Sequence, residues 1–424
     1  MSEGPTLRVQ ATARTPVRSV APVLSFLMSQ MTVVDAPLRA ALWSGVDARR
    51  ERLLEISHRI HANPEIRFEE RQASGWLADE LRSEGFAVEV PAGGLETAFV
   101  ARKRGGAGAG PTVAILCEYD ALEGLGHACG HNVIATMGLG GGLALGEAMD
   151  ELPGELRVIG CPGEEGGGGK AHLIEAGVFD DVDVAMMIHP LAEDRQGGPS
   201  LARVGWDVAF TGVPAHAAMA PHLGVNALDA VRLAFSGIDA LRQQVTPDVR
   251  MHAIVTHGGD AANIVPERAS MRLFVRCADR AYLLESLAPR ARKVLEGAAM
   301  MTGCGLTVSD VAPAYENMLP NLSLAQRYAL HAADLGRHAA PVDPTDFGGS
   351  SDMGNVSQRI PSLHAFIAID DEAKPHTEAF RDAARSERGD AAVIDGSKLL
   401  AALALDALTD AELLAHARAE RSAG

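Results

Sequence analysis

The chain has 424 residues, of which 47% are apolar and 22% are charged. This length suits two domains, and the composition is ordinary for a globular protein with a sizeable core. The formal net charge of −17 argues against nucleic acid or an anionic membrane surface as the main partner.

The cysteines and the apolar runs indicate the compartment. The five cysteines are odd in number and show no clustered spacing, unlike a secreted disulfide framework. No apolar run reaches the roughly 18–20 residues that span a bilayer. Residues 1–45 contain arginines and a short apolar run broken by Pro22, without a small-residue cleavage site. We therefore expect a cytoplasmic protein that begins with a disordered extension.

Residues 46–200 alternate between two periodicities. Apolar residues recur at helical spacing over 46–61 and 70–84, and again in the small-residue run that follows His131. Between and after these helices, short apolar runs predict strands at 86–90, 98–102, 112–118, 156–160 and 182–188. Strands that alternate with helices predict a mostly parallel sheet covered on both faces.

The pattern changes after about Leu201. Residues 201–312 follow the order strand, helix, two strands, helix, strand, which is that of a ferredoxin-like unit. Residues 313–410 return to the α/β pattern, with a last helix predicted to begin near Asp395, and 411–424 form a charged tail that we expect to fray. The predicted fold class is therefore α/β, with a ferredoxin-like α+β domain inserted into a mostly parallel-sheet domain.

Polar side chains follow three of the predicted strands. They are Asp120, the pair Glu164 and Glu165, and His189. In open α/β sheets, ligands gather outside the carboxyl ends of the strands, so we expect these side chains to converge. Cys129 and His131 precede the next helix on the same edge.

Three readings of Cys129 and His131 are available. They are incidental, they form a nucleophile and base pair, or they bind metal. Residues two apart rarely face each other well enough for base activation. A thiolate and an imidazole are good ligands for zinc-like or manganese-like ions, which favours metal binding beside the other strand ends. Glu118 and His127, in the same stretch, are interpreted as structural or pocket-lining.

Glu164 and Glu165 are adjacent acids in a glycine-rich loop. Adjacent side chains point apart, so one carboxylate can bind metal while the other faces substrate. This division suits a metal-activated water with a separate general base. A phosphate-binding loop is excluded because Glu164 and Ala171 stand where that motif needs Gly and Ser or Thr.

Other candidate residues lie later in the chain. His376 follows a late apolar strand and is the best candidate to close the site, whereas His364, inside that strand, is interpreted as a core histidine. His216, Asn263 and Arg276 lie in the inserted segment. For these three the local pattern leaves ordinary loop polarity and a surface salt bridge open.

Eight motifs carry a family resemblance. In chain order they are HRIHANPEIRFEE, EYDALEGLGHACGHN, CPGEEGGGGK, MIHP, GVPAHAAMAPHLGVNALDA, ANIVPE, SSDMGNVS and PHTEAF. Together, over residues 46–408, they resemble the M20 metallopeptidase family. Within it they resemble the amidohydrolase branch that includes aminobenzoyl-glutamate hydrolase, an aminoacylase-1-like dipeptidase and the auxin-conjugate hydrolases.

The resemblance implies a site for two divalent metal ions, Zn²⁺ or Mn²⁺. The implied ligands are Cys129, His131, Glu165, His189 and His376. It further implies that Glu164 is the general base and that Asp120 is a supporting acid.

The resemblance also implies a homodimer. The inserted domain would act as a dimerisation and lid domain, and its His216 would reach the partner's active site to stabilise the tetrahedral oxyanion. Asn263 and Arg276 would hold the substrate carboxylate. Relatives commonly have Pro where this chain has Glu123, a departure that we expect to loosen its loop and alter substrate fit.

We therefore expect a metal-dependent amidohydrolase. Its substrate would be a small molecule that bears a carboxylate: an N-acyl amino acid, an aminobenzoyl-glutamate-like conjugate or an unusual dipeptide. An alternative from another class is a non-catalytic metal- or ligand-binding protein on the same scaffold.

Overall fold

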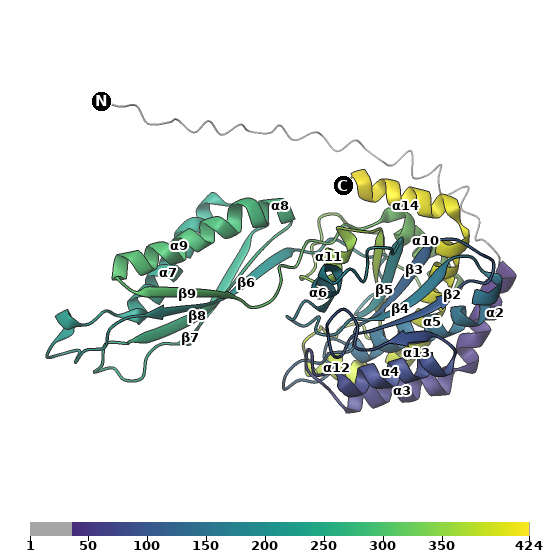
Figure 1. Cartoon of the computed structure of the whole chain (residues 1–424), viewed down its shortest axis with the longest axis horizontal. Coiled ribbons are helices and arrows are strands. Elements are labelled where there is room, and N and C mark those ends of the chain that lie inside the picture. The colour runs from purple at the N-terminus through teal and green to yellow at the C-terminus, as the bar shows by residue number, and fades with distance from the viewer. Residues whose placement is uncertain (1–35, 424) are drawn as a thin grey trace, which may run out of the picture.

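The structure is a computed structural model that describes residues 36–423. These residues form two bodies, each built on its own sheet (Figure 1). The larger, here called the catalytic body, contains the strands before and after the insertion, and the smaller, here called the lid body, contains strands β6 to β9.

The catalytic body has a six-stranded sheet in the order β1-β2-β4-β3-β5-β10. Its parallel pairs are β3 with β4, β3 with β5, and β5 with β10, whereas β1–β2 and β2–β4 are antiparallel. The predicted mostly parallel sheet is confirmed, with an antiparallel edge. The strands are β1 (Ala87–Glu89), β2 (Phe99–Arg104), β3 (Thr112–Cys117), β4 (Glu155–Gly160), β5 (Val184–Leu191) and β10 (Ser362–Ala368).

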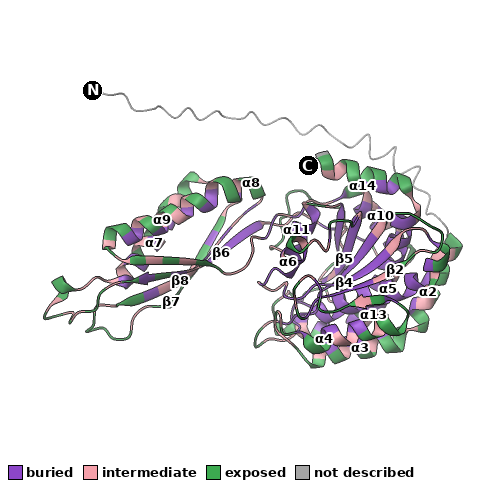
Figure 2. Cartoon of the chain, viewed as in Figure 1, coloured by how far each residue is buried: buried purple, intermediate pink, exposed green. Residues whose placement is uncertain are grey.

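Helices cover this sheet. Helices α5 (His131–Ala148) and α13 (Glu387–Thr409) pack on each other and on the central strands β3 and β5. Around them, and at the edges of the sheet, lie α2 (Ala36–Ala48), α3 (Arg50–Ala62), α4 (Arg71–Ser83), η1 (Met149–Glu151), α6 (Gly169–Glu175), α10 (Leu322–Asp334), α11 (Met353–Ser357), α12 (Glu378–Ala383) and α14 (Ala411–Ala423). As a result, strands β3, β4, β5 and β10 are buried almost throughout, whereas the edge strand β1 is more exposed (Figure 2).

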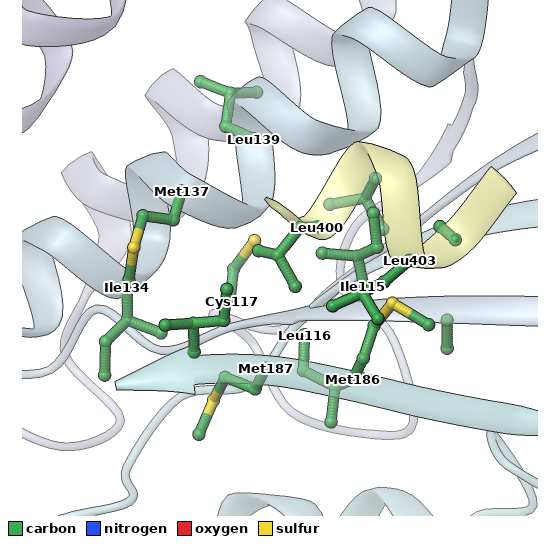
Figure 3. Close-up of a cluster of buried hydrophobic side chains, with 14 of the residues drawn as sticks. Ile115, Leu116, Cys117, Ile134, Met137, Leu139, Met186, Met187, Leu400 and Leu403 are labelled. Atoms are coloured by element: carbon green, nitrogen blue, oxygen red, sulfur yellow. The ribbon is translucent and has the colours of Figure 1, made fainter. Parts of the chain in front are cut away.

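The glycines of α5 allow close contact with its neighbours. A Cβ on Gly138 would lie 2.4 Å from the Cys117 sulfur, and one on Gly141 would lie 2.8 Å from the Leu400 Cβ. Figure 3 shows the resulting core, in which side chains of β3, β5, α5 and α13 meet. This packing fixes the carboxyl end of β3 relative to the amino end of α5.

The lid body has a four-stranded antiparallel sheet in the order β7-β8-β6-β9. This is the strand order of a ferredoxin-like unit, so the predicted fold class is confirmed. One face is covered by α7 and α9, and on β8 the buried residues alternate with more exposed ones. The elements are β6 (Ala202–Thr211), η2 (Pro221–Leu223), α7 (Ala227–Leu241), η3 (Arg242–Gln244), β7 (Arg250–His257), β8 (Arg268–Cys277), α8 (Arg280–Tyr282), a π-helical turn η4 (Leu283–Leu287), α9 (Ala288–Thr302) and β9 (Gly305–Asp310).

Two predictions about the chain ends need correction. The predicted disordered extension over 1–45 overlaps α2, in which Leu42 is buried and Trp43 Nε1 donates to Lys398 O at 3.0 Å. The remainder of that extension, residues 1–35, lies outside the described residues. The predicted frayed tail is instead α14, where Asn321 Nδ2 donates to Ala417 O at 2.8 Å and Glu420 accepts from Leu322 N at 2.7 Å. Tertiary contacts, invisible in a local pattern, stabilise both helices.

The last long helix also begins earlier than predicted. Helix α13 begins at Glu387 rather than near Asp395, because Ser386 Oγ accepts from Gly389 N at 3.1 Å and caps its amino end. Among residues 36–423, no helix is long and apolar enough to cross a membrane.

Candidate metal centre

The predicted site residues of the catalytic body meet at one edge of its sheet. Asp120 follows β3, Glu164 and Glu165 follow β4, His189 lies near the end of β5, and His376 follows β10. Because these four strands run in the same direction, their carboxyl ends share that edge. Cys129 and His131 join them from the loop that leads into α5.

Five side chains there form two groups that share Cys129. One group is Cys129, His131 and His189, and the other is Cys129, Glu165 and His376. Within each group the ligand atoms lie within 4.8 Å of one another. The Cys129 sulfur is 3.5 Å from His189 Nε2, and His376 Nε2 is 3.2 Å from Glu165 Oε1. A thiolate common to both groups is the arrangement needed to bridge two metal ions.

The hydrogen bonds of the histidines test whether metal fits. His131 Nδ1 lies 2.9 Å from the Asp120 carboxylate, and His189 Nδ1 lies 2.7 Å from Pro190 O. Each acceptor fixes the proton on Nδ1 and leaves a lone pair on Nε2. An acceptor of this kind behind the ring is usual for a metal-binding histidine. His131 Nε2 is buried and lacks a hydrogen-bond partner among the described residues. The donor set therefore fits divalent metal.

Asp120 has a second contact. Its Oδ2 accepts from Glu165 N at 2.8 Å. One buried carboxylate thus orients His131 through its side chain and Glu165 through its backbone. The supporting role of Asp120 stays a prediction, and it would act through these two contacts.

The two adjacent glutamates differ in their electrostatics. Burial raises the pKa of Glu164 well above its usual range, and the nearby Glu118, Glu165 and Asp352 carboxylates add to that effect. Burial would also raise the pKa of Glu165, but the imidazoles of His376 and His131 lower it overall. Neighbouring acids whose pKa values are pushed apart suit different tasks, one as a proton acceptor and one as an anionic ligand.

The histidines at the site differ in pKa. Against the lowering effect of burial, the Asp120 and Cys129 side chains raise the pKa of His131, and the hydrogen bond to Glu165 raises the pKa of His376. Burial lowers the pKa of His189 to about 4, so its imidazole is neutral and free to bind metal. His364, predicted to be a core histidine, is 9% exposed and lies on the neighbouring strand with its ring 5.9 Å from that of His189.

His376 has a positive φ of 66° and donates its backbone N to Ala128 O at 2.8 Å. Such a backbone conformation in a residue other than glycine is typical of functional sites.

A short segment, Arg67–Glu70, holds the glycine-rich loop that carries the two glutamates. Glu70 is buried, and its Oε1 accepts from Gly163 N at 2.9 Å. Phe68 has a positive φ of 64°, and a Cβ on Gly167 would lie 2.6 Å from its ring. Arg67 donates to Glu165 O at 3.2 Å. We call Arg67–Glu70 the brace, because it contacts the glycine-rich loop from Gly163 to Gly167.

The connection to the lid body contacts the general-base candidate. Tyr315 OH donates to Glu164 O at 2.6 Å, and the Arg203 guanidinium stacks on the Tyr315 ring at 4.0 Å. Arg203 lies in β6, the first lid strand, so the backbone of Glu164 is linked to the junction between the two bodies.

The three candidate residues of the lid body are not placed together. Arg276, near the end of β8, donates to Ser350 Oγ at 3.3 Å on the catalytic side, and its Nε is buried without a partner in the described part of the chain. His216 and Asn263 are exposed and lie in adjoining loops, where Ala217 N donates to Asn263 O at 3.0 Å. These loops follow β6 and β7, at the ends of the lid away from the catalytic body (Figure 1). Within one chain, the structure does not bring His216 and Asn263 to the metal ligands.

Sequence patterns missed several residues around the site. Glu70 lies within one of the family motifs, but no local pattern marks it as functional. Lys170 is noticed only because it follows a glycine-rich run that does not match the phosphate-loop motif. No local signal points to Tyr315. Glu118, interpreted as structural or pocket-lining, has its Oε2 3.5 Å from His131 Nε2. Glu123 is exposed in its loop.

Comparisons with known proteins agree with this geometry. The family model for peptidase family M20/M25/M40 matches residues 113–406. The mouse Xaa-Arg dipeptidase is 38% identical over 389 residues, which cover 88% of this chain and 90% of that protein. One of the subunits of p-aminobenzoyl-glutamate hydrolase from Escherichia coli (strain K12) is 37% identical over 278 residues, which cover 61% of this chain and 57% of that protein.

Solved structures share the fold. An aminobenzoyl-glutamate utilization protein from Klebsiella pneumoniae aligns with a TM-score of 0.69 at 22% identity, covering 85% of this chain and 97% of that chain. A dinuclear metal-binding M20 peptidase from Bacillus subtilis aligns with a TM-score of 0.63 at 21% identity, covering 85% and 99%.

Fold, site and comparisons define a metallo-amidohydrolase. The chain belongs to peptidase family M20/M25/M40, as its motifs indicated. These findings also favour an enzyme over the alternative of a non-catalytic binding protein.

Proposed function

We propose that this enzyme hydrolyses the amide bond of a small substrate with a free carboxylate, a dipeptide or an N-acyl amino acid, at a two-metal site. The observation that carries the proposal is the pair of ligand groups that share Cys129 beside Glu164. Cys129, His131 and His189 would hold one ion, and Cys129, Glu165 and His376 the other. Zn²⁺ suits the thiolate and imidazole ligands, and Mn²⁺ is the second candidate.

Two bound divalent ions would supply Lewis acidity, which polarises the scissile carbonyl and makes a water nucleophilic at neutral pH. Glu164 takes the proton of the attacking water and delivers it to the leaving amine. Burial raises its pKa, which favours the protonated form that donates to the leaving amine. Asp120 keeps His131 and Glu165 in place through the two hydrogen bonds described above.

The lid residues complete the site in a homodimer. His216 and Asn263 lie in exposed loops far from the ligands of their own chain, so they would serve the partner's site. Exposed apolar residues lie in the same loops and on the edge strand β7: Met219, Leu223, Ile264, Ile254 and Val255. His216 would stabilise the oxyanion, and Arg276 with Asn263 would bind the substrate carboxylate.

The substrate class is tested directly. Metal-loaded protein is incubated with dipeptides that end in Arg or Lys, with N-acyl amino acids and with p-aminobenzoyl-glutamate, and products are read by mass spectrometry. We expect cleavage of at least one carboxylate-bearing amide, its loss on chelation and its return with Zn²⁺ or Mn²⁺. Amidated substrates that lack the free carboxylate are the matched controls. Equal cleavage of free and amidated forms would refute the role of Arg276.

A further inference from the structure

Next to the metal ligands lies a buried ionic cluster that the proposed mechanism does not use. Lys170, Glu118 and Asp352 are each fully buried, at 0% exposure. Lys170 Nζ lies 2.5 Å from Glu118 Oε1 and 2.6 Å from Asp352 Oδ1. Lys170 N also donates to Asp352 Oδ2 at 2.9 Å.

The cluster connects three separate segments. Glu118 follows β3, Lys170 lies in the first turn of α6, and Asp352 directly precedes α11 in the part of the chain that follows the lid. Burial of charged groups is costly unless they are paired and hydrogen-bonded, so these contacts hold the three segments in one arrangement.

The cluster is adjacent to the general-base candidate. Carboxylate oxygens of Glu118, Glu164 and Asp352 lie within 4.8 Å of one another. Like charges at this spacing repel strongly in a buried site. The Lys170 ammonium binds two of the three carboxylates, which allows Glu164 to stay beside them.

The loop geometry transmits the position of Lys170 to Glu164. Gly167 N and Gly168 N both donate to Gly163 O, at 3.0 and 2.9 Å, so the loop is closed on itself. A Cβ on Gly169 would lie 1.8 Å from Pro162 O, which leaves the chain no room to shift there. The brace anchors this loop at Gly163, and Lys170 follows directly after its other end.

Glu118 extends the cluster to a metal ligand. Its Oε1 is bound by Lys170, and its Oε2 has no hydrogen-bond partner within residues 36–423 but lies 3.5 Å from His131 Nε2. Lys170 therefore holds the Glu118 carboxylate between the metal ligand His131 and the general-base candidate Glu164.

We propose that Lys170 is a positioning residue for amide hydrolysis: by clamping Glu118 and Asp352 it sets the place of Glu164 relative to the metal ligands. The proposal rests on the proposed role of Glu164 as general base. The competing explanation is that Lys170 only balances buried negative charge, in which case its removal affects folding and nothing else.

The experiment separates these explanations by removing charge in matched steps. The variants are Lys170→Met, the double variant Lys170→Met with Asp352→Asn, and Lys170→Arg. Lys293→Met is the control, because Lys293 is exposed on α9 of the lid. Each purified full-length protein is measured for metal content, thermal midpoint, kcat and KM on a substrate found in the panel.

We expect Lys170→Met to lower both the thermal midpoint and kcat. The double variant, in which one buried carboxylate is neutralised, regains most of the thermal midpoint and retains both metal ions. Its kcat stays about 10²-fold below the wild type with KM little changed, which is the effect expected for a misplaced catalytic group. Lys170→Arg, which keeps a cation, recovers part of the lost kcat.

Recovery of kcat together with the thermal midpoint in the double variant would overturn the proposal, as would an unchanged kcat in Lys170→Met. The variant Glu164→Gln distinguishes a failure of the proposal for Lys170 from a failure of the proposed function. If Glu164→Gln stays active, the base assignment is wrong; if it is inactive while the double variant is fully active, only the role of Lys170 is wrong.

Discussion

The catalytic body and the lid body present their polar residues in opposite ways. In the catalytic body, Asp120, His131 and Glu118 are buried at the carboxyl edge of the sheet and bonded to residues of the same chain. In the lid body, His216 and Asn263 are exposed, and the hydrogen bonds found for them lie within or between their two adjoining loops. One part of the site is therefore assembled by the fold of a single chain, while we propose that a second chain supplies the other part.

The sheets explain this difference. The central strands of the catalytic body are buried on both faces, so polar groups collect at the carboxyl edge where the strands end. The lid sheet has helices on one face only, and its edge strand and loop ends remain exposed. Variants in the two bodies should therefore affect different properties.

The largest effect should come from the shared ligand. Cys129→Ala removes a ligand from both groups, so we expect both ions and all activity to be lost. His376→Ala removes a ligand from one group only and should leave one ion tightly bound. Metal content per chain after gel filtration measures this; equal loss in both variants would refute the sharing of Cys129.

Glu164→Gln should come next. The amide cannot accept a proton, so we expect kcat to fall by about 10²–10⁴-fold. Both ions should remain, because the five proposed ligands are unchanged. Glu164 also lies within 4.8 Å of His131 and Glu165, so loss of an ion in this variant would make Glu164 a ligand instead. Retention of full activity with both ions would exclude Glu164 as the base.

Mixing two inactive proteins tests the contribution of the lid. In a hybrid of His216→Ala and Glu164→Gln subunits, one of the two sites combines an intact Glu164 with an intact His216. Random exchange between dimers would therefore restore about a quarter of the wild-type activity. No recovery, despite subunit exchange shown by native mass spectrometry, would place His216 in the site of its own chain or outside the reaction.

The brace should give a smaller effect. Glu70→Ala leaves Gly163 N, Phe68 N and the Thr97 hydroxyl without their acceptor. We expect a loss of about 1–3 kcal/mol in the free energy of unfolding, measured with urea. Glu70→Gln keeps an oxygen acceptor and is the matched control. The two variants should bind metal alike if the brace acts only on the loop.

The last effect concerns pH. Burial, with the nearby Asp120, raises the pKa of Glu70 from 4.5 to about 7. The folded protein then binds a proton that the unfolded chain has released, so this group makes stability fall as pH rises from 4.5 to 7. Glu70→Gln should remove that decline, so the stability difference between variant and wild type should change across this window. A constant difference across the same window would contradict the raised pKa.

Local patterns indicated most of the candidate metal ligands and the order of elements. Residues such as Asp120, Glu165 and His189 stand where an apolar strand ends, and that position can be read without knowing the fold. The helices α2 and α14 were missed because the contacts that stabilise them come from distant segments, such as Lys398 for Trp43 and Asn321 for Ala417.

By itself the sequence determined the two sheets, the ligand types and the family, since strand and helix periods and motif spacing are local properties. Only the tertiary structure decided how the ligands divide into two groups around Cys129, and which residues hold them. Lys170 is separated by 52 positions from Glu118 and by 182 from Asp352, and no periodicity connects them. Their contact exists because the sheet brings strand ends together and because buried charges must find partners.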